Sequence, residues 1–282
     1  MNARAMLVAA VAAAAAVTSA CSPTVTGTAS PASDLGRAPA PGTVAAAPLV
    51  AGSQNTWINI VGESDPARAD ALAPGTLIRG LDKDRDMANC SLGAKLVGNA
   101  ITTAGHCGLA GSPRLLGSGI EVGSVEQSVD KIPGDGPVLD FAVVKLNVPV
   151  SNSPVHIAGR PVAGVLKVKA ADALRAGTSV CFVGVKSGIG CGPLVSADPQ
   201  GITVDVASAA GDSGSPVFVV DGRTQTVTLI GLLSGRVDGS MGATYLDAAL
   251  DAAGTEALVD ANAAGMVAAG NPDYSLRVSP QL

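Results

Sequence analysis

The apolar residues of this 282-residue chain lie in many short runs that turn residues separate. From about residue 75 onward the runs are roughly five to eight residues long and rich in β-branched side chains, as strands are. Examples are AKLVGNAITTA, LDFAVVKLNV and QTVTLIGLLS. No helical crossover separates the runs, so the pattern disfavours a parallel βαβ sheet and predicts an antiparallel sandwich or paired barrels.

One segment near the end has a helical pattern instead. Residues 245–260 read YLDAALDAAGTEALVD, and a helix here would place Leu246, Leu250 and Leu258 on one side. We expect a terminal helix that packs against the domain and takes no part in chemistry.

The first 20 residues have the pattern of an export signal peptide. MNARAM carries one arginine, LVAAVAAAAAV is a short apolar stretch, and TSAC brings small residues to the cleavage point. The apolar run is too short for a membrane span. Two products are open: ordinary cleavage after Ala20, or a lipoprotein that carries its lipid on Cys21, although Thr18 stands where such signals usually have leucine.

The cysteines bear on that choice, because exported proteins tend to pair their thiols. The chain has five: Cys21, Cys90, Cys107, Cys181 and Cys191. Four can pair within the folded part, which leaves Cys21 for lipid attachment. We therefore expect an exported protein, either a cell-surface lipoprotein held to the membrane by this lipid or a secreted protein.

The composition of the chain changes from one segment to the next. Residues 21–74 begin with a small, proline-dotted stretch up to residue 50 that reads as a flexible stalk. Residues 51–74 are either a short pro-segment or the leading edge of the domain. The folded domain is expected over 75–260, and 261–282 form a C-terminal tail.

Composition limits the core and the partners. Apolar residues make up 47% and aromatic residues only 2%, so Val, Leu, Ile and Ala must fill the core. The net charge is −5 and no basic run appears, which gives no electrostatic case for nucleic-acid binding.

The stretch AAGDSGSPVFV places Ser213 between two glycines, beside an acid and directly before a predicted strand. Gly, Asp, Ser and Pro are ordinary turn residues, so a plain turn is one interpretation. The other is that Ser213 is a nucleophile, which would need a base and an orienting acid.

Only two histidines could be that base. His156 lies among turn residues in SNSPVHIAG with no acid beside it, and we interpret it as a surface or packing residue. His106 lies in AITTAGHCG, where a strand ends, and Cys107 could bond back to Cys90 and fix the backbone around the imidazole.

Asp140 is the candidate acid, because it begins the apolar strand LDFAVVKL. An aspartate flanked by Leu139 and Phe141 is unusual, since burial of a carboxylate is costly unless it is paired.

These motifs together resemble those of trypsin/chymotrypsin-like serine peptidases, in particular the bacterial secreted type. TAGHC, DFAVVKL and GDSGSP occur in the family's order over roughly residues 75–250. The resemblance implies an all-β fold of two antiparallel six-stranded Greek-key barrels, about 75–158 and 159–250, with a short C-terminal helix. VCFVGVKSGIGCG resembles a loop of the bacterial members and implies a hairpin disulfide between Cys181 and Cys191.

The resemblance also implies a mechanism. Ser213 would attack a peptide carbonyl, His106 would serve as general base, and Asp140 would orient the imidazole. The backbone N–H groups of Gly211 and Ser213 would form the oxyanion hole. The expected partners are polypeptide substrates, and the protein is expected to be a monomer. No metal or organic cofactor is required.

Asp212 departs from the family pattern, in which the acid beside the nucleophile is buried and paired. Bacterial members often supply an arginine where this chain has Phe182. Lys186 or another cation is one substitute. A new N-terminus at Ile60, in the stretch Ile60-Val61-Gly62, is another, although no basic residue precedes it.

The specificity pocket is assigned by the resemblance alone. It would contain Ala207, Ser208, Ser234, Gly235 and Ala243. None is acidic, so a lysine or arginine of the substrate would lack a counter-charge, and we expect an apolar or aromatic residue before the cleaved bond. Asp205 and Asp238 lie near enough in sequence to overturn this, and Ser234-Gly235 would pair with the substrate backbone.

Two alternatives stand beside the peptidase. One is a catalytically inactive member of the same fold, a binding or adhesion module at the cell surface. The other, an esterase of the α/β-hydrolase type, requires a strand–GxSxG–helix context and the order Ser, acid, His, and the sequence has neither.

Overall fold

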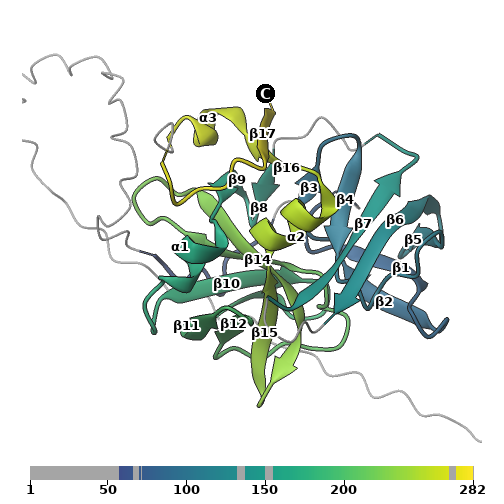
Figure 1. Cartoon of the computed structure of the whole chain (residues 1–282), viewed down its shortest axis with the longest axis horizontal. Helices are drawn as coiled ribbons and strands as arrows, with labels where there is room; N and C mark the ends of the chain where they lie inside the picture. Colours follow the sequence, from purple (N-terminus) through teal and green to yellow (C-terminus); the bar gives the residue numbers. More distant parts are fainter. Residues whose placement is uncertain are drawn as a thin grey trace, which may run out of the picture. The chain divides into compact units, whose positions relative to one another are not determined.

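Seven strands in the first part of the described chain form one antiparallel ring, shown in blue to teal in Figure 1. They are β1 (Leu77–Leu81), β2 (Met87–Ser91), β3 (Lys95–Leu96), β4 (Ala100–Thr103), β5 (Pro113–Leu116), β6 (Glu121–Lys131) and β7 (Leu139–Leu146). Residues 87–96 form one bent segment that contains β2 and β3. Its first part, β2, pairs with β1, and its last part, β3, pairs with β4. Because β1 also pairs with β5, this bent segment closes a barrel of six strands.

A second antiparallel ring follows. Its strands are β10 (Ser179–Gly184), β11 (Gly188–Asp198), β12 (Gly201–Val204), β13 (Pro216–Val220), β14 (Val227–Val237) and β15 (Ser240–Tyr245). They pair in the order β13-β10-β11-β12-β15-β14, and the additional pairing of β13 with β14 closes the ring. The predicted fold, two antiparallel six-stranded barrels followed by a short helix, is confirmed.

The structure is a computed structural model, and its description covers part of the chain. The described residues are 57–65, 70, 72–131, 137–149, 155–266 and 271–281. The predicted signal peptide 1–20, Cys21, the stalk up to residue 50 and residues 51–56 lie outside the described residues. Within the described residues, no helix has both the length and the apolar character needed to cross a membrane.

Strand β7 has an apolar core on each side, which explains why it reads as a nearly continuous apolar run. Ala142 and Val144 lie in the core of the first barrel. Phe141 and Val143 lie in a second core that also contains residues of β10 and β13. Asp140 is therefore presented at the start of a strand that is fixed on both faces.

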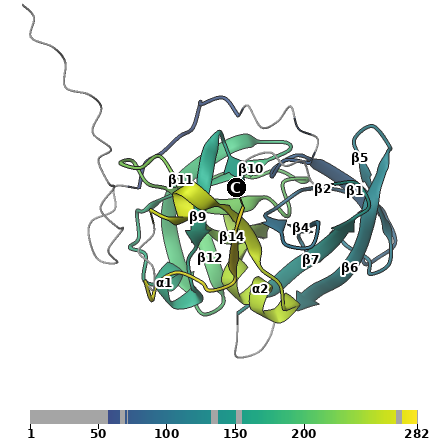
Figure 2. The ribbon, with the colours of Figure 1, turned by 90° about the horizontal axis from the view of Figure 1, so that it is seen from above.

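The predicted helix is present but shorter than the pattern suggested. Helix α2 (Leu246–Ala253) buries Leu246 and Leu250, and Gly254 ends it in the left-handed conformation at φ +64°. Leu258 lies instead in strand β16 (Ala257–Asp260). From the viewpoint of Figure 2, α2 lies close to β7 and β14, and contacts join it to both strands.

Elements outside the two rings extend the sheets. Along the sequence, three elements come between the two rings: β8 (His156–Ile157), β9 (Arg160–Val165) and α1 (Val168–Asp172). Strand β9 pairs in parallel with β14. Beyond residue 260, where the sequence suggested a tail, α3 (Ala261–Ala264) follows and β17 (Val278–Gln281) pairs in parallel with β16. Tyr274 is buried in the core of the second barrel.

The segment before the first barrel also packs on the domain. Trp57 forms an isolated bridge with Asp221, and the N–H of Ile58 donates to the carbonyl of Val220. Ile60 is only 1% exposed. Residues 57–60 therefore pack on the folded unit.

Candidate active site

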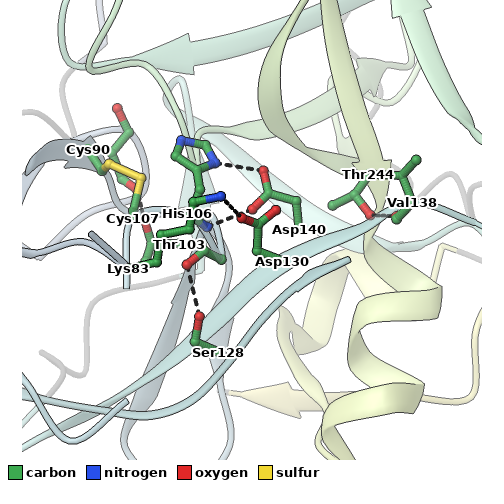
Figure 3. Close-up of polar contacts among 12 residues, drawn as sticks. Lys83, Cys90, Thr103, His106, Cys107, Ser128, Asp130, Val138, Asp140 and Thr244 are labelled. Carbon is green, nitrogen blue, oxygen red and sulfur yellow. Dashed lines mark hydrogen bonds and ion pairs between the residues drawn. A yellow bond between two sulfur atoms is a disulfide. The ribbon is translucent and has the colours of Figure 1, made fainter. Parts of the chain in front are cut away.

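His106 and Asp140 form a two-point contact at the open end of the first barrel, as Figure 3 shows. Nδ1 of His106 lies 2.8 Å from Oδ2 of Asp140, and the backbone N–H of His106 donates to Oδ1 at 2.9 Å. The loop after β4 supplies the histidine and the start of β7 supplies the acid. Asp140 is 5% exposed, and this double hydrogen bond offsets the cost of burying its carboxylate.

The environment of the imidazole raises the pKa of His106 above its ordinary value of 6.5. The hydrogen bond that His106 donates to Asp140 is the largest cause, and partial burial acts in the opposite direction. Asp130, which pairs across the strands with Asp140, adds to the rise, while its ion-pair partner Lys83 opposes it.

The loop that carries His106 is held from two sides. The hydroxyl of Ser128 donates to the carbonyl of Gly105 at 2.8 Å. Cys107 forms a disulfide with Cys90, and a ring nitrogen of His106 lies within 4.8 Å of both sulfur atoms. Because both sulfurs are in the disulfide, they cannot bind a metal as thiolates. This group is therefore a support for the imidazole rather than a metal site.

Ser213 lies in a turn directly before β13 that docks beside this loop. The N–H of Ser91 donates to the carbonyl of Ser213 at 2.8 Å, and the N–H of Gly214 donates to Leu233 at 2.7 Å. A side chain at Gly214 would place its Cβ 2.4 Å from Oγ1 of Thr103 and 2.7 Å from the N of Ala104. Only glycine fits this approach, which brings the serine turn against the residues that lead into His106.

The reacting atoms themselves are not joined. Among the described residues, no hydrogen bond links Nε2 of His106 to Oγ of Ser213. Catalytic hydrogen bonds are often long before substrate binds and tighten in the reacting complex. The supports of the two side chains are adjacent, because Ser91 bonds to Ser213 and its neighbour Cys90 is joined to Cys107.

The turn also leaves backbone donors available. Gly211 has φ +108°, a conformation that favours glycine. Within the described part of the chain, the N–H groups of Gly211 and Ser213 donate to no acceptor. Both residues keep part of their surface exposed, whereas Asp212 between them is buried. Two unpaired donors beside a serine hydroxyl can receive a developing oxyanion.

Asp212 is paired with neutral donors rather than with a cation. Its Oδ1 accepts from the N–H of Lys186 at 2.8 Å and from that of Ser187 at 3.1 Å. Its Oδ2 accepts from the Ser187 hydroxyl at 2.5 Å and from the N–H of Ala209 at 2.8 Å.

Neither substitute suggested by the sequence supplies a counter-charge. Lys186 contributes its backbone N–H, and no ion pair joins its ammonium group to Asp212 among the described residues. Ile60 is buried in the core, and Ile58, two residues before it, donates its N–H to the carbonyl of Val220 in β13. Phe182 is buried in the core of the second barrel.

The five residues assigned to the specificity pocket come from two places. Ser234 and Gly235 lie on β14, and Ala243 pairs with Leu233 from the neighbouring β15. Ala207 and Ser208 lie in the segment between β12 and the serine turn. The Ser234 hydroxyl is buried and has no partner within the described residues. A Cβ at Gly235 would meet no atom within 4 Å, so the strand is open there.

His156 contacts a different part of the fold. It lies on β8, half-buried, with Nε2 4.0 Å from Oδ2 of Asp260. The sequence shows no acid beside it, but the fold brings one from β16. Its position on a short surface strand agrees with a packing role.

Sequence reasoning missed the serines that support the site, among them Ser91, Ser128 and Ser187. Ser91 ends β2, Ser128 lies within β6 and Ser187 lies in the turn between β10 and β11, and nothing in their sequence context indicates these contacts. The second disulfide, between Cys181 and Cys191, is present in the structure as the resemblance implied.

No protein-family model and no curated protein sequence matches the chain. Solved structures do resemble it. A chymotrypsin from Cellulomonas bogoriensis has 21% identity and a TM-score of 0.46, over 67% of this chain and 98% of its own. Thermobifida fusca protease A has 20% identity and a TM-score of 0.47, over 67% and 98%. A glutamic-acid-specific serine protease that uses a histidine triad in substrate binding has 18% identity and a TM-score of 0.48, over 65% and 98%.

Proposed function

We propose that the chain is a serine endopeptidase that hydrolyses peptide bonds through an acyl-enzyme on Ser213. The observation that carries the proposal is the double hydrogen bond between His106 and Asp140, held beside the turn that presents Ser213. A buried carboxylate fixes the imidazole with Nδ1 protonated, so that Nε2 is the free basic nitrogen.

In the first step, Nε2 of His106 accepts the proton of the Ser213 hydroxyl as its oxygen attacks the substrate carbonyl carbon. The carbonyl oxygen becomes an anion and accepts from the N–H groups of Gly211 and Ser213, which have no other acceptor in the described chain. His106 then gives its proton to the leaving amine, and the C–N bond breaks. Water repeats the sequence on the ester and releases the acid.

Asp140 acts throughout as the orienting acid. Its carboxylate accepts from Nδ1 and stabilises the imidazolium that forms during each proton transfer. No metal or organic cofactor enters these steps.

The test of this proposal is hydrolysis of a peptide p-nitroanilide series by the purified mature protein. Ser213→Ala and His106→Ala should each lower kcat by at least about 10⁴-fold, because each removes an essential partner in proton transfer. Ser118→Ala is the matched control, since Ser118 lies exposed in a turn and is expected to leave the rate unchanged. Equal rates for wild type and Ser213→Ala would refute the proposal and favour the inactive binding module.

We also propose a preference for an apolar or aromatic residue before the cleaved bond. The assigned pocket residues are uncharged, and Ala243 is buried against the apolar core of the second barrel. A cationic side chain would be desolvated there without a partner. A peptide series that differs only at this position should give the highest kcat/KM for Phe or Leu. Faster cleavage after Arg or Lys would contradict the assignment.

The cellular location belongs to the same proposal. Two disulfides in the folded unit suit an oxidising compartment outside the cytosol. Export through the N-terminal signal, with or without a lipid on Cys21, would provide it. The mass of the mature protein distinguishes the two forms.

A further inference from the structure

The proposed activity requires the segment 209–214, here called the oxyanion turn, to keep one shape. We propose that two positioning residues, Ser91 and Ser187, hold this turn by neutral hydrogen bonds, so that it forms in the uncut chain without any ion pair to Asp212. We call the two residues the serine clamp. This inference rests on the proposed function and concerns how its oxyanion site is maintained.

Ser187 holds the turn through Asp212. The Asp212 side chain is buried, at 0% exposure, and a buried carboxylate must be satisfied by charge or by hydrogen bonds. Ser187 provides two of the four donors to Asp212, its hydroxyl and its backbone N–H. The other two are the N–H groups of Lys186 and Ala209. Four donors satisfy both oxygens, and none of them depends on a nearby cation.

Ser91 holds the turn directly. It is also 0% exposed, and its hydroxyl donates to the carbonyl of Gly211 at 3.0 Å while accepting from the N–H of Val185 at 3.0 Å. Its N–H donates to the carbonyl of Ser213, and its carbonyl accepts from Oγ1 of Thr103 at 2.8 Å. Ser91 thereby connects the oxyanion turn to the hairpin of the second barrel and to the strand that leads to His106.

These contacts fix the peptide planes on both sides of the Ser213 N–H. The carbonyl of Gly211 belongs to the peptide plane before Asp212, and the carbonyl of Ser213 belongs to the peptide plane between Ser213 and Gly214. With both carbonyls bound by Ser91, the plane that carries the Ser213 N–H can turn only by a coupled rotation about ψ of Asp212 and φ of Ser213. The direction of an oxyanion donor therefore depends on a side chain of the first barrel.

The hairpin that carries Ser187 has a fixed position. Its strands β10 and β11 are joined by the disulfide between Cys181 and Cys191. At its tip, a Cβ on Gly184 would lie 2.4 Å from Oδ1 of Asp212. The hairpin backbone thus approaches the carboxylate more closely than any residue with a side chain would allow.

The consequence is that no new N-terminus has to be made. Ile60 is buried in the core, and Ile58 before it is bonded to β13 in the continuous chain. All four donors to Asp212 come from residues 186, 187 and 209. The protein should be fully active with the bond before Ile60 intact.

The experiment uses the purified mature chain, with mass analysis to verify that residues 57–65 are continuous, and an uncharged peptide p-nitroanilide. Ser187→Ala and Ser91→Ala are each expected to lower kcat about tenfold or more with KM changed less than about twofold, because oxyanion donors act on the transition state. Ser187→Thr restores a hydroxyl at the exposed hairpin tip and should recover most of the rate. Ser118→Ala is the matched control and should behave as wild type.

A second readout separates positioning from general destabilisation. The carbonyl stretch of a stable acyl-enzyme shifts to lower frequency when oxyanion donors bind the carbonyl oxygen. In Ser187→Ala this band should move upward, while thermal unfolding stays close to that of Ser118→Ala. If Ser91→Ala fails to fold, Ser187→Ala and its threonine rescue still decide the question.

Three results overturn the clamp: wild-type kcat in Ser187→Ala, failure of threonine to restore the rate, or activity that appears only after cleavage before Ile60. The failure of the proposed function itself looks different. In that case wild type and Ser213→Ala hydrolyse the substrate equally slowly, and the clamp variants have no activity to change.

Discussion

His106 carries the proton in the proposed reaction, and its surroundings determine the pH at which it can do so. The hydrogen bond that the imidazole donates to Asp140 raises the pKa of His106 above 6.5. The imidazole must be neutral to accept the serine proton, so kcat/KM should fall as the pH drops through this raised pKa. We therefore expect an acidic limb with its midpoint above pH 6.5.

Asp140→Asn tests the cause of that limb. The change replaces the charged acceptor and favours the wrong imidazole tautomer, so kcat should fall by about 10⁴-fold and the limb should move to lower pH. The pH profiles of the variant and of Ser118→Ala, measured over the same range, provide the comparison. A limb at the same pH in Asp140→Asn would show that another group sets it.

At this scale the sequence indicated the reacting residues and one support, the disulfide between Cys90 and Cys107, but not the partner of Asp212. His106, Asp140 and Ser213 stand in motifs whose residue types the reaction needs. The partner of Asp212 could not be read from sequence, because it consists mostly of backbone N–H groups and one serine on a distant hairpin. Because every residue except proline has a backbone N–H, residue identity does not show which backbone groups act as donors.

Among the elements, the disulfide between Cys90 and Cys107 connects the two halves of the site. Cys90 precedes Ser91, which bonds to Ser213, and Cys107 follows His106. Replacing both cysteines by alanine should lower the free energy of unfolding by about 3 kcal/mol, as expected for a closed loop of this size. Activity should fall as well, because the loop of His106 loses one of its two supports.

Urea unfolding and kcat/KM, measured on the same preparation, check this prediction. The double alanine variant of Cys181 and Cys191 serves as the comparison. These two cysteines are 10 residues apart in sequence, whereas Cys90 and Cys107 are 17 residues apart, so the bond between Cys181 and Cys191 closes a shorter segment. Unchanged stability and unchanged activity in the Cys90/Cys107 variant would contradict the role assigned to this disulfide.

The predicted end of the C-terminal helix was wrong because the local pattern and the strand pairing disagree there. Leu246, Leu250 and Leu258 fit one helical face, yet Gly254 ends α2 and the following residues pair as β16 with β3. Residues 261–282 lie beyond the motifs that carry the resemblance and are predicted to form a C-terminal tail. Val278–Gln281 pair in parallel with β16, a contact that no local pattern reveals.

For the whole molecule, the two closed barrels bring together residues that are distant along the chain. The first barrel supplies His106, Asp140 and Ser91, and the second supplies the oxyanion turn and the hairpin with Ser187. The start of β7 is also tied to the second barrel, because the N–H of Val138 donates to Gln200 and the hydroxyl of Thr244 donates to the carbonyl of Val138. The site therefore depends on the junction of both barrels.

The number of short β-branched runs and the absence of crossovers predicted an antiparallel all-β fold. Barrel closure could not be derived from them, because it depends on residues 87–96 pairing with two different strands. The motifs supplied that expectation through resemblance.

The central claim is that Ser213 is a nucleophile activated by His106, and covalent labelling tests it most directly. A phosphonylating serine-hydrolase probe should add one adduct to the mature protein, and peptide mass analysis should place it on Ser213. His106→Ala should be labelled far more slowly, and Ser118→Ala at the wild-type rate. A folded, fully processed protein that takes up no adduct, or takes it up equally as Ser213→Ala, would contradict the account.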